Sequence, residues 1–130
     1  MAEPMQNERV AARGTWGTVE WALDARRAMP AREFFLTLGA SDQAKMLALF
    51  QRLAEAGQIW NREKFKGLGG KHGLWEFKSF QVRMLGDFRP NHRFLVAHGL
   101  IKKQDNLSPS DILIAMRVLA ENDAVEKGGR

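Results

Sequence analysis

Three runs of alternating apolar and polar residues follow one another closely, at positions 74–80, 82–88 and 93–100. A period of two residues is typical of a β-strand that buries one face. The connections between the runs are too short for a crossover, so the runs are predicted to form adjacent antiparallel strands. One face of this sheet is expected to pack against helices, and the other is expected to be polar and basic.

The segment before this sheet is predicted to contain one strand and a helical hairpin. Residues 15–23 alternate in polarity and predict the strand. A helix starts at Pro30 and is expected to end at Gly39 in the left-handed conformation. The next helix is expected to be capped by Ser41 or Asp42. Its apolar residues have the spacing of one buried helix face: Met46, Leu49, Phe50 and Leu53.

A last helix is predicted after the sheet, with Ser108 as its N-cap and Pro109 in its first position. Its predicted buried stripe is Ile112, Ala115, Met116 and Leu119. The order of strand, helical hairpin, antiparallel strands and helix predicts an α+β fold. We expect one domain over 15–122, a flexible N-terminal segment over 1–14 and a flexible tail over 123–130.

Positive charge is concentrated in one part of the chain. The net charge of the 130 residues is +5, but residues 60–104 contain ten basic and three acidic residues. Clustered positive charge attracts polyanions such as RNA through steering and counterion release. A solvated basic surface without a partner is the alternative interpretation.

Several other classes of function have no support in the sequence. Cysteine is absent, which suits the cytoplasm, and there is neither a membrane-spanning run nor a secretory signal at the N-terminus. The glycine-rich segment 66–73 lacks the pattern and the surrounding βαβ order of a nucleotide-binding P-loop. The histidines lack metal-ligand spacing, and no serine-hydrolase motif is present. We therefore predict no metal and no cofactor.

The basic residues of the sheet are the candidates for chemistry. Lys78 and Arg83 flank a tight turn, and Lys102 and Lys103 follow the next predicted strand. If these side chains converge, they can orient an RNA strand and stabilise the charge that develops on a phosphate during cleavage. The ribose 2′-hydroxyl is an internal nucleophile, so such a reaction needs neither a metal nor a covalent intermediate. The same side chains could instead be solvated sheet residues.

Other residues are given supporting roles. Glu76 shares a face with Lys78 and is expected to be an ion-pair partner, whereas His98 is expected to be a hydrogen-bonded core residue. Residues expected to contact the RNA backbone are Lys66, Lys71, His72, Arg89 and Arg93.

Four short segments in order resemble the RelE/HigB toxins, in particular the phage-type HigB branch. The sequence GLWEFK at 73–78 resembles the G-L-W-E-L-R strand of that family. RML at 83–85 resembles the next strand, and HGLIKKQ at 98–104 resembles the family's H-G-F-x-K-K-T segment. SPSDI at 108–112, followed by Ala115, resembles the start of its last helix.

This resemblance implies a RelE-like fold and a ribosome-dependent endonuclease that cuts mRNA in the ribosomal A site. It also implies a helix-turn-helix antitoxin as the protein partner. Lys78 stands where the family has a basic residue on the central sheet, Arg83 at its phosphate-binding arginine, and Lys102 and Lys103 at its late basic pair. On this basis Arg83→Ala is expected to give a folded protein with relieved growth inhibition.

The chain departs from the family pattern at two positions. Lys78 replaces the commoner arginine, and Gly86 falls where many members have a tyrosine that stacks on a base. Stacking would then need Phe88 or Trp75, or no aromatic residue. Two non-catalytic alternatives remain open, namely a toxin of the same fold that poisons DNA gyrase and a phage-derived RNA-binding module.

Overall fold

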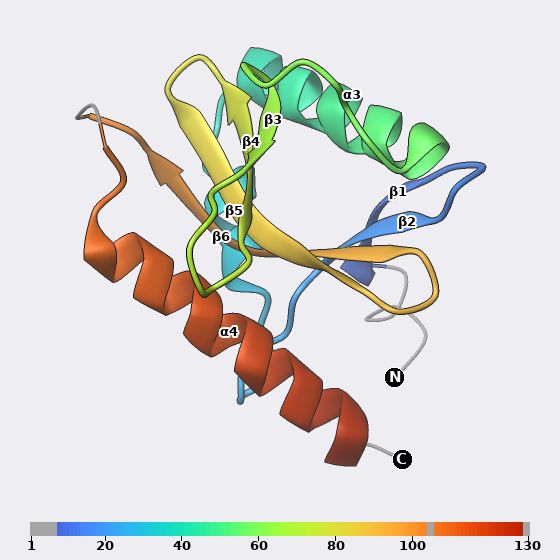
Figure 1. Ribbon diagram of the computed structural model, residues 1–130, viewed down its shortest axis with the longest axis vertical. Coiled ribbons are helices and arrows are strands. Elements are labelled where there is room, and N and C mark those ends of the chain that lie inside the picture. The colour runs from blue at the N-terminus through green and yellow to red at the C-terminus, as the bar shows by residue number, and fades with distance from the viewer. Residues whose placement is uncertain (1–7, 104–105, 129–130) are drawn as a thin grey trace.

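A computed structural model of the protein describes residues 8–103 and 106–128. Its architecture is α+β, as predicted, with a mixed six-stranded sheet and three helices in the described part (Figure 1). The strands are β1 (Val10–Arg13), β2 (Thr18–Trp21), β3 (Phe65–Gly67), β4 (Trp75–Ser79), β5 (Val82–Arg89) and β6 (Arg93–Ile101). The helices are α2 (Pro30–Leu36), α3 (Ala40–Ala56) and α4 (Pro109–Gly128).

The sheet has the strand order β1-β2-β6-β5-β4-β3. The predicted antiparallel pairing of β4, β5 and β6 is confirmed, and the predicted N-terminal strand, β2, joins β6 in parallel. Two short strands were missed: β1 lies within the segment predicted to be flexible, and β3 lies at the start of the glycine-rich segment. Both span no more than four residues and are held by pairing with a neighbour, so their local sequence signal is weak.

Helices cover both faces of the sheet. The helical hairpin of α2 and α3 packs on one face, where the predicted stripe of α3 is buried together with Val19, Trp21 and Phe77. Helix α4 lies across the opposite face, as Figure 1 shows. Leu85, Leu95 and Ala97 are buried beneath it. The second face was expected to be polar and basic, but the part of it beneath α4 is apolar and buried.

The ends of the helices differ from the predictions at two places. Gly39 does not end α2 in a left-handed conformation; it is the extended N-cap of α3, so neither Ser41 nor Asp42 is the cap. Ser108 caps α4 as predicted, because its hydroxyl oxygen accepts a hydrogen bond from the Asp111 N–H at 3.2 Å.

Helix α4 continues further than expected. It runs to Gly128, so the predicted flexible tail is wrong for residues 123–128. Its buried residues are Ala115, Val118, Leu119 and Asn122, whereas Met116 is exposed. In the described part of the chain, no helix combines the length and apolar character needed to cross a membrane.

A β-bulge in β6 changes which face the end of this strand presents. Leu85 pairs with His98 and Gly86 pairs with Val96, so Ala97 is the extra residue. A bulge places two successive residues opposite one, which interrupts the alternation of side chains. His98 is consequently on the α4 face with Ala97. It is hydrogen-bonded, as predicted, but it is only half-buried and is not a core residue.

Candidate functional site

Two lysines, Lys66 and Lys102, line a pocket beside the start of α4, and Lys78 lies near both of them. Lys66 on β3 lies opposite Glu76 on β4, Lys78 follows on β4, and Lys102 comes directly after β6. The Lys102 N–H donates to the Gln81 carbonyl at 2.7 Å, which holds this residue against the β4–β5 turn. A pocket of about 220 Å³ opens here, which we call the cationic pocket, and its lining residues are Lys66, Leu68, His72, Glu76, Lys102, Asn106, Leu107 and Ile112.

The lysines lie close enough to influence one another. The pKa of Lys78 is lowered by partial burial and by the positive charges of Lys66, Arg83 and Lys102, and the opposing effect of Glu76 does not cancel this. Within residues 8–103 and 106–128, no salt bridge involves Lys66, Lys78 or Lys102. Unpaired like charges repel one another, so an anion bound among them would lower the electrostatic energy.

Arg83 has a different environment from these lysines. Its side chain is 9% exposed and its Nε lies 3.4 Å from Oε2 of Glu76, whose side chain is 3% exposed. Its Nη1 donates to the carbonyls of Val82, at 3.1 Å, and Phe80. Glu76 is thus an ion-pair partner, as predicted, but of Arg83. Because Arg83 is buried and directed at its own turn, it does not fit the expected role of an exposed phosphate ligand.

The glycine-rich loop places His72 at the cationic pocket. Gly69, Gly70 and Gly73 have positive φ angles, which lets the loop turn sharply. The Leu74 N–H donates to Nδ1 of His72 at 3.1 Å, which leaves Nε2 as the ring nitrogen available to a ligand. Lys71 is exposed on this loop and does not line the pocket.

A second hollow of about 190 Å³ adjoins the cationic pocket. It shares Lys102 with that pocket and is also lined by Lys103, Ser108 and Asp111. The Nε2 atom of His98 lies 2.8 Å from Oδ1 of Asp111, and this contact ties β6 to the first turn of α4. Burial raises the pKa of Asp111, but hydrogen bonds from His98 and Ser108 outweigh burial and hold it below its ordinary value.

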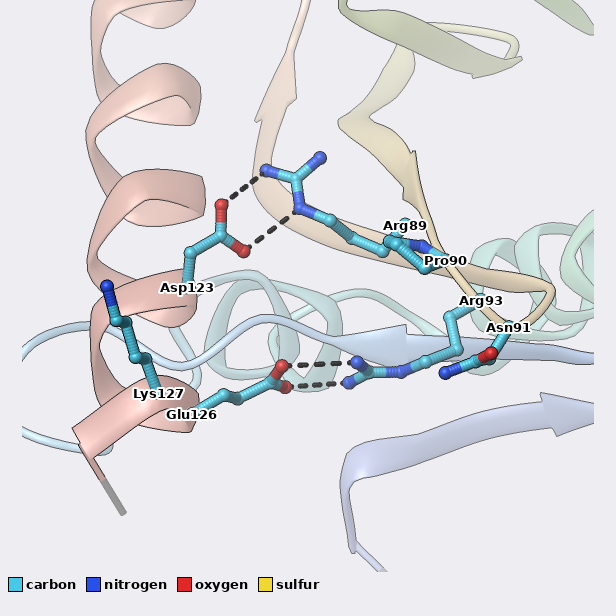
Figure 2. Close-up of a pocket in the computed structure, with 7 residues that line it drawn as sticks. All are labelled: Arg89, Pro90, Asn91, Arg93, Asp123, Glu126 and Lys127. Atoms are coloured by element: carbon cyan, nitrogen blue, oxygen red, sulfur yellow. Dashed lines mark hydrogen bonds and ion pairs between the residues drawn. The ribbon is translucent and has the colours of Figure 1, made fainter. Parts of the chain in front are cut away.

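Arg89 lies at the far end of β5, away from the cationic pocket. It lines an open pocket of about 630 Å³ between the β5–β6 turn and the last turns of α4 (Figure 2). Its guanidinium binds both carboxylate oxygens of Asp123, at 2.9 and 3.0 Å. This bidentate pair and the nearby Asp87 raise the pKa of Arg89.

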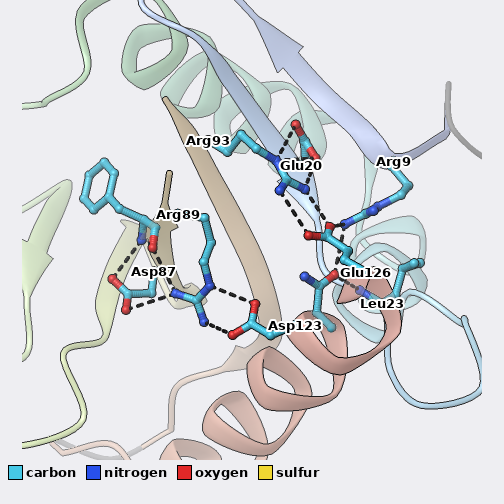
Figure 3. Close-up of polar contacts among 10 residues, drawn as sticks. Arg9, Glu20, Leu23, Asp87, Arg89, Arg93, Asp123 and Glu126 are labelled. Carbon is cyan, nitrogen blue, oxygen red and sulfur yellow. Dashed lines mark hydrogen bonds and ion pairs between the residues drawn. The ribbon is translucent and has the colours of Figure 1, made fainter. Parts of the chain in front are cut away.

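Arg93 is paired in the same way with two carboxylates. It contacts Glu20 at 2.9 Å and Glu126 at 2.7 Å (Figure 3). Hydrogen bonds from Arg93 lower the pKa of Glu126 to about 2. Arg9 joins this network through Glu126, at 3.0 Å. Arg89 and Arg93 therefore clamp α4 to the sheet, and the structure does not bring them together with the cluster of lysines.

The aromatic candidates for base stacking lie on the other face of the sheet. Trp75 and Phe88 are half-buried beside α3, where their rings pack edge to face with centroids 5.5 Å apart. A side chain at Gly86 is disfavoured, because a Cβ there would collide with the Leu95 carbonyl and the Phe94 ring. Exposed Trp60, which lies near Trp75, was not singled out from the sequence, because no periodic pattern surrounds it.

The mixed six-stranded sheet, the helical hairpin and the C-terminal helix give the α+β architecture of a RelE-like fold. The chain belongs to the family described as "Phage derived protein Gp49-like (DUF891)", whose model matches residues 33–120. This is a toxin-type family similar to RelE and HigB. No curated protein matches the sequence at a significant level.

Proposed function

We propose that the protein is the toxin of a type II toxin–antitoxin system and an endoribonuclease of the phage-type HigB branch that cleaves mRNA on the ribosome. The observation that carries this proposal is that Lys66 and Lys102 line one pocket and Lys78 lies close enough to feel their charges, while none of the three has a carboxylate partner among the described residues. Membership of a toxin-type family supports it. The proposed partners are mRNA and a helix-turn-helix antitoxin, and the proposed location is the cytoplasm.

The chemistry uses the RNA's own nucleophile. The ribose 2′-oxygen attacks the adjacent phosphorus and its proton passes to solvent, while the bond from phosphorus to the 5′-oxygen breaks. The products are a 2′,3′-cyclic phosphate and a 5′-hydroxyl. This step needs no metal, because the nucleophile is internal and the pocket's ammonium groups can stabilise the phosphate charge.

Residues that line the cationic pocket and residues beside it have different roles in this reaction. Lys66 and Lys102 neutralise the non-bridging phosphate oxygens, and Lys103 holds the adjoining stretch of backbone. Lys78 gives up a proton more readily than an isolated lysine because its pKa is lowered, so it protonates the leaving 5′-oxygen. The Nε2–H of His72 is available to a phosphate oxygen. Arg83 acts as a positioning residue, since it fixes Glu76 and the β4–β5 turn.

The test is expression of the protein in bacteria, followed by primer extension on a reporter mRNA. Wild-type protein is expected to inhibit growth and to give breaks at codon spacing. Lys78→Ala is expected to slow cleavage about 100-fold, the range in which general acids contribute. Lys127→Ala, on the last turn of α4, is the matched control and should cleave like wild type. Cleavage by the Lys78 variant at the wild-type rate would refute the proposal.

A non-catalytic RNA-binding module is the second candidate function. It is favoured by the burial of Arg83, which removes the guanidinium from the pocket. In that case wild-type protein would bind RNA and leave it intact. Intact mRNA with broken DNA would instead indicate a gyrase poison.

A further inference from the structure

A second pocket lies on the other face of the sheet, beside the edge strand β3. It has a volume of about 460 Å³ and is lined by Gly57, Gln58, Ile59, Trp60, Arg62, Phe65, Lys66, Trp75 and Phe88. We propose that this aromatic pocket receives a nucleobase of the RNA strand whose phosphate binds in the cationic pocket. This inference rests on the proposed function and adds to it a site for a neighbouring nucleotide.

The floor of the aromatic pocket is a rigid set of rings. Phe65 and Trp75 are stacked, with centroids 5.0 Å apart and an interplanar angle of 18°. Phe88 meets both rings edge to face, at 6.3 and 5.5 Å. Phe65 is buried, whereas Trp75 and Phe88 keep part of their surface open. A flat aromatic ligand can therefore pack here without first ordering the floor.

Trp60 forms a wall that is poorly covered by the protein itself. Its relative exposure is 81%, and it makes no ring contact with another aromatic residue in the described part of the chain. Together with Phe65, Trp75 and Phe88 this ring borders one hollow, and contiguous exposed apolar surface of this kind marks an interaction site. A base between this ring and the floor would be stacked and removed from water.

The charges around the pocket favour a nucleic acid over an apolar peptide. Arg62 and Lys66 are its charged lining residues, and none of the lining residues is acidic. Lys66 also lines the cationic pocket, so one side chain borders both sites across the edge of the sheet. A phosphate held by Lys66 would place the attached nucleotide within reach of the aromatic rings. Alternating cationic and aromatic contacts are typical of single-strand binding.

The test measures binding, independently of cleavage. A short, fluorescently labelled oligoribonucleotide with 2′-O-methyl groups cannot be cleaved, and its dissociation constant can be followed by anisotropy. Trp60→Ala is expected to weaken binding about tenfold, and Trp60→Phe is expected to keep most of the affinity because it keeps a stacking face. Leu113→Ala removes another exposed apolar side chain, on α4, and should bind like wild type.

An abasic scan then assigns the loss to a base. Replacing one nucleotide at a time by an abasic residue should weaken wild-type binding about tenfold at one position, and Trp60→Ala should lose nothing further there. Unchanged affinity of Trp60→Ala, or a loss that is the same at every abasic position, would overturn the inference. The inference would also be overturned if Trp60→Ala lost binding to a protein partner but kept its affinity for the oligoribonucleotide. If wild type cleaves RNA and Trp60→Ala binds normally, this inference fails while the proposed function stands.

Discussion

Arg83 and Glu76 form a buried ion pair, and its disruption is expected to destabilise the fold. The side chains are 9% and 3% exposed, and they lie 3.4 Å apart without an aligned hydrogen bond between them. Arg83→Met removes the positive charge and leaves the buried Glu76 carboxylate without its ion-pair partner. Breaking a buried pair in this way typically costs about 3–5 kcal/mol. The structure therefore replaces the expectation that Arg83→Ala leaves a normally folded protein with the expectation of a marked loss of stability.

Urea unfolding at neutral pH provides the assay. With a slope of about 1.5 kcal/mol/M, a loss of 3 kcal/mol lowers the unfolding midpoint by about 2 M. The double variant Arg83→Met with Glu76→Leu should recover most of this loss, because well-packed apolar residues can replace a buried ion pair at little cost. A single variant that loses less than about 1 kcal/mol, or a double variant no more stable than the single one, would refute this reasoning.

Two further predictions concern the clamp on α4 and the bulge. The pKa of Glu126 is lowered to about 2, so the pair with Arg93 stabilises the fold above the ordinary carboxyl pKa of about 4.5 and is lost as the pH falls toward 2. Urea titrations between these pH values should therefore show falling stability in wild type and a shallower fall in Arg93→Ala; equal slopes would contradict the clamp. Gly86→Ala should lower the free energy of unfolding by about 2 kcal/mol, because the added methyl group meets the Leu95 carbonyl. Thermal unfolding checks this, and an unchanged midpoint would show that the bulge can relax.

The burial of Arg83 also bears on how growth assays should be interpreted. A variant at this position can lose toxicity because the domain is less stable, without any change in phosphate binding. Lys78 and Lys102 form no such ion pair among the described residues. Substituting either lysine should therefore remove a positive charge with less effect on the stability of the fold. For that reason the cleavage test relies on Lys78.

The local sequence predicted the elements with strong periodicity. The runs that became β4, β5 and β6 and the buried stripe of α3 were read correctly, because each pattern reflects which side of one element meets the core. The short strands β1 and β3 could not be found in this way. Both depend on pairing with a neighbouring strand, and pairing leaves little trace in three or four residues.

The sequence predicted only some of the residues that make up the candidate site. The sequence identified Lys66, Lys78 and Lys102 as basic residues of one segment, and the structure brings them together. The sequence could not distinguish these lysines from Arg89 and Arg93, which belong to the same basic segment. Apart from Asp87, which lies beside Arg89 on β5, the carboxylates that neutralise those arginines come from β2 and α4, more than 30 residues away in the chain.

The sequence alone determined the α+β class, the main strands and helices, and the excess of positive charge between residues 60 and 104. Only the tertiary structure decided which of those charges remain unpaired, that His98 faces α4, and that an aromatic pocket adjoins the lysines across β3. The physical reason is that local periodicity records the polarity of an element's faces. Ion pairs, bulges and pockets depend on the register and docking of segments that are distant in the chain.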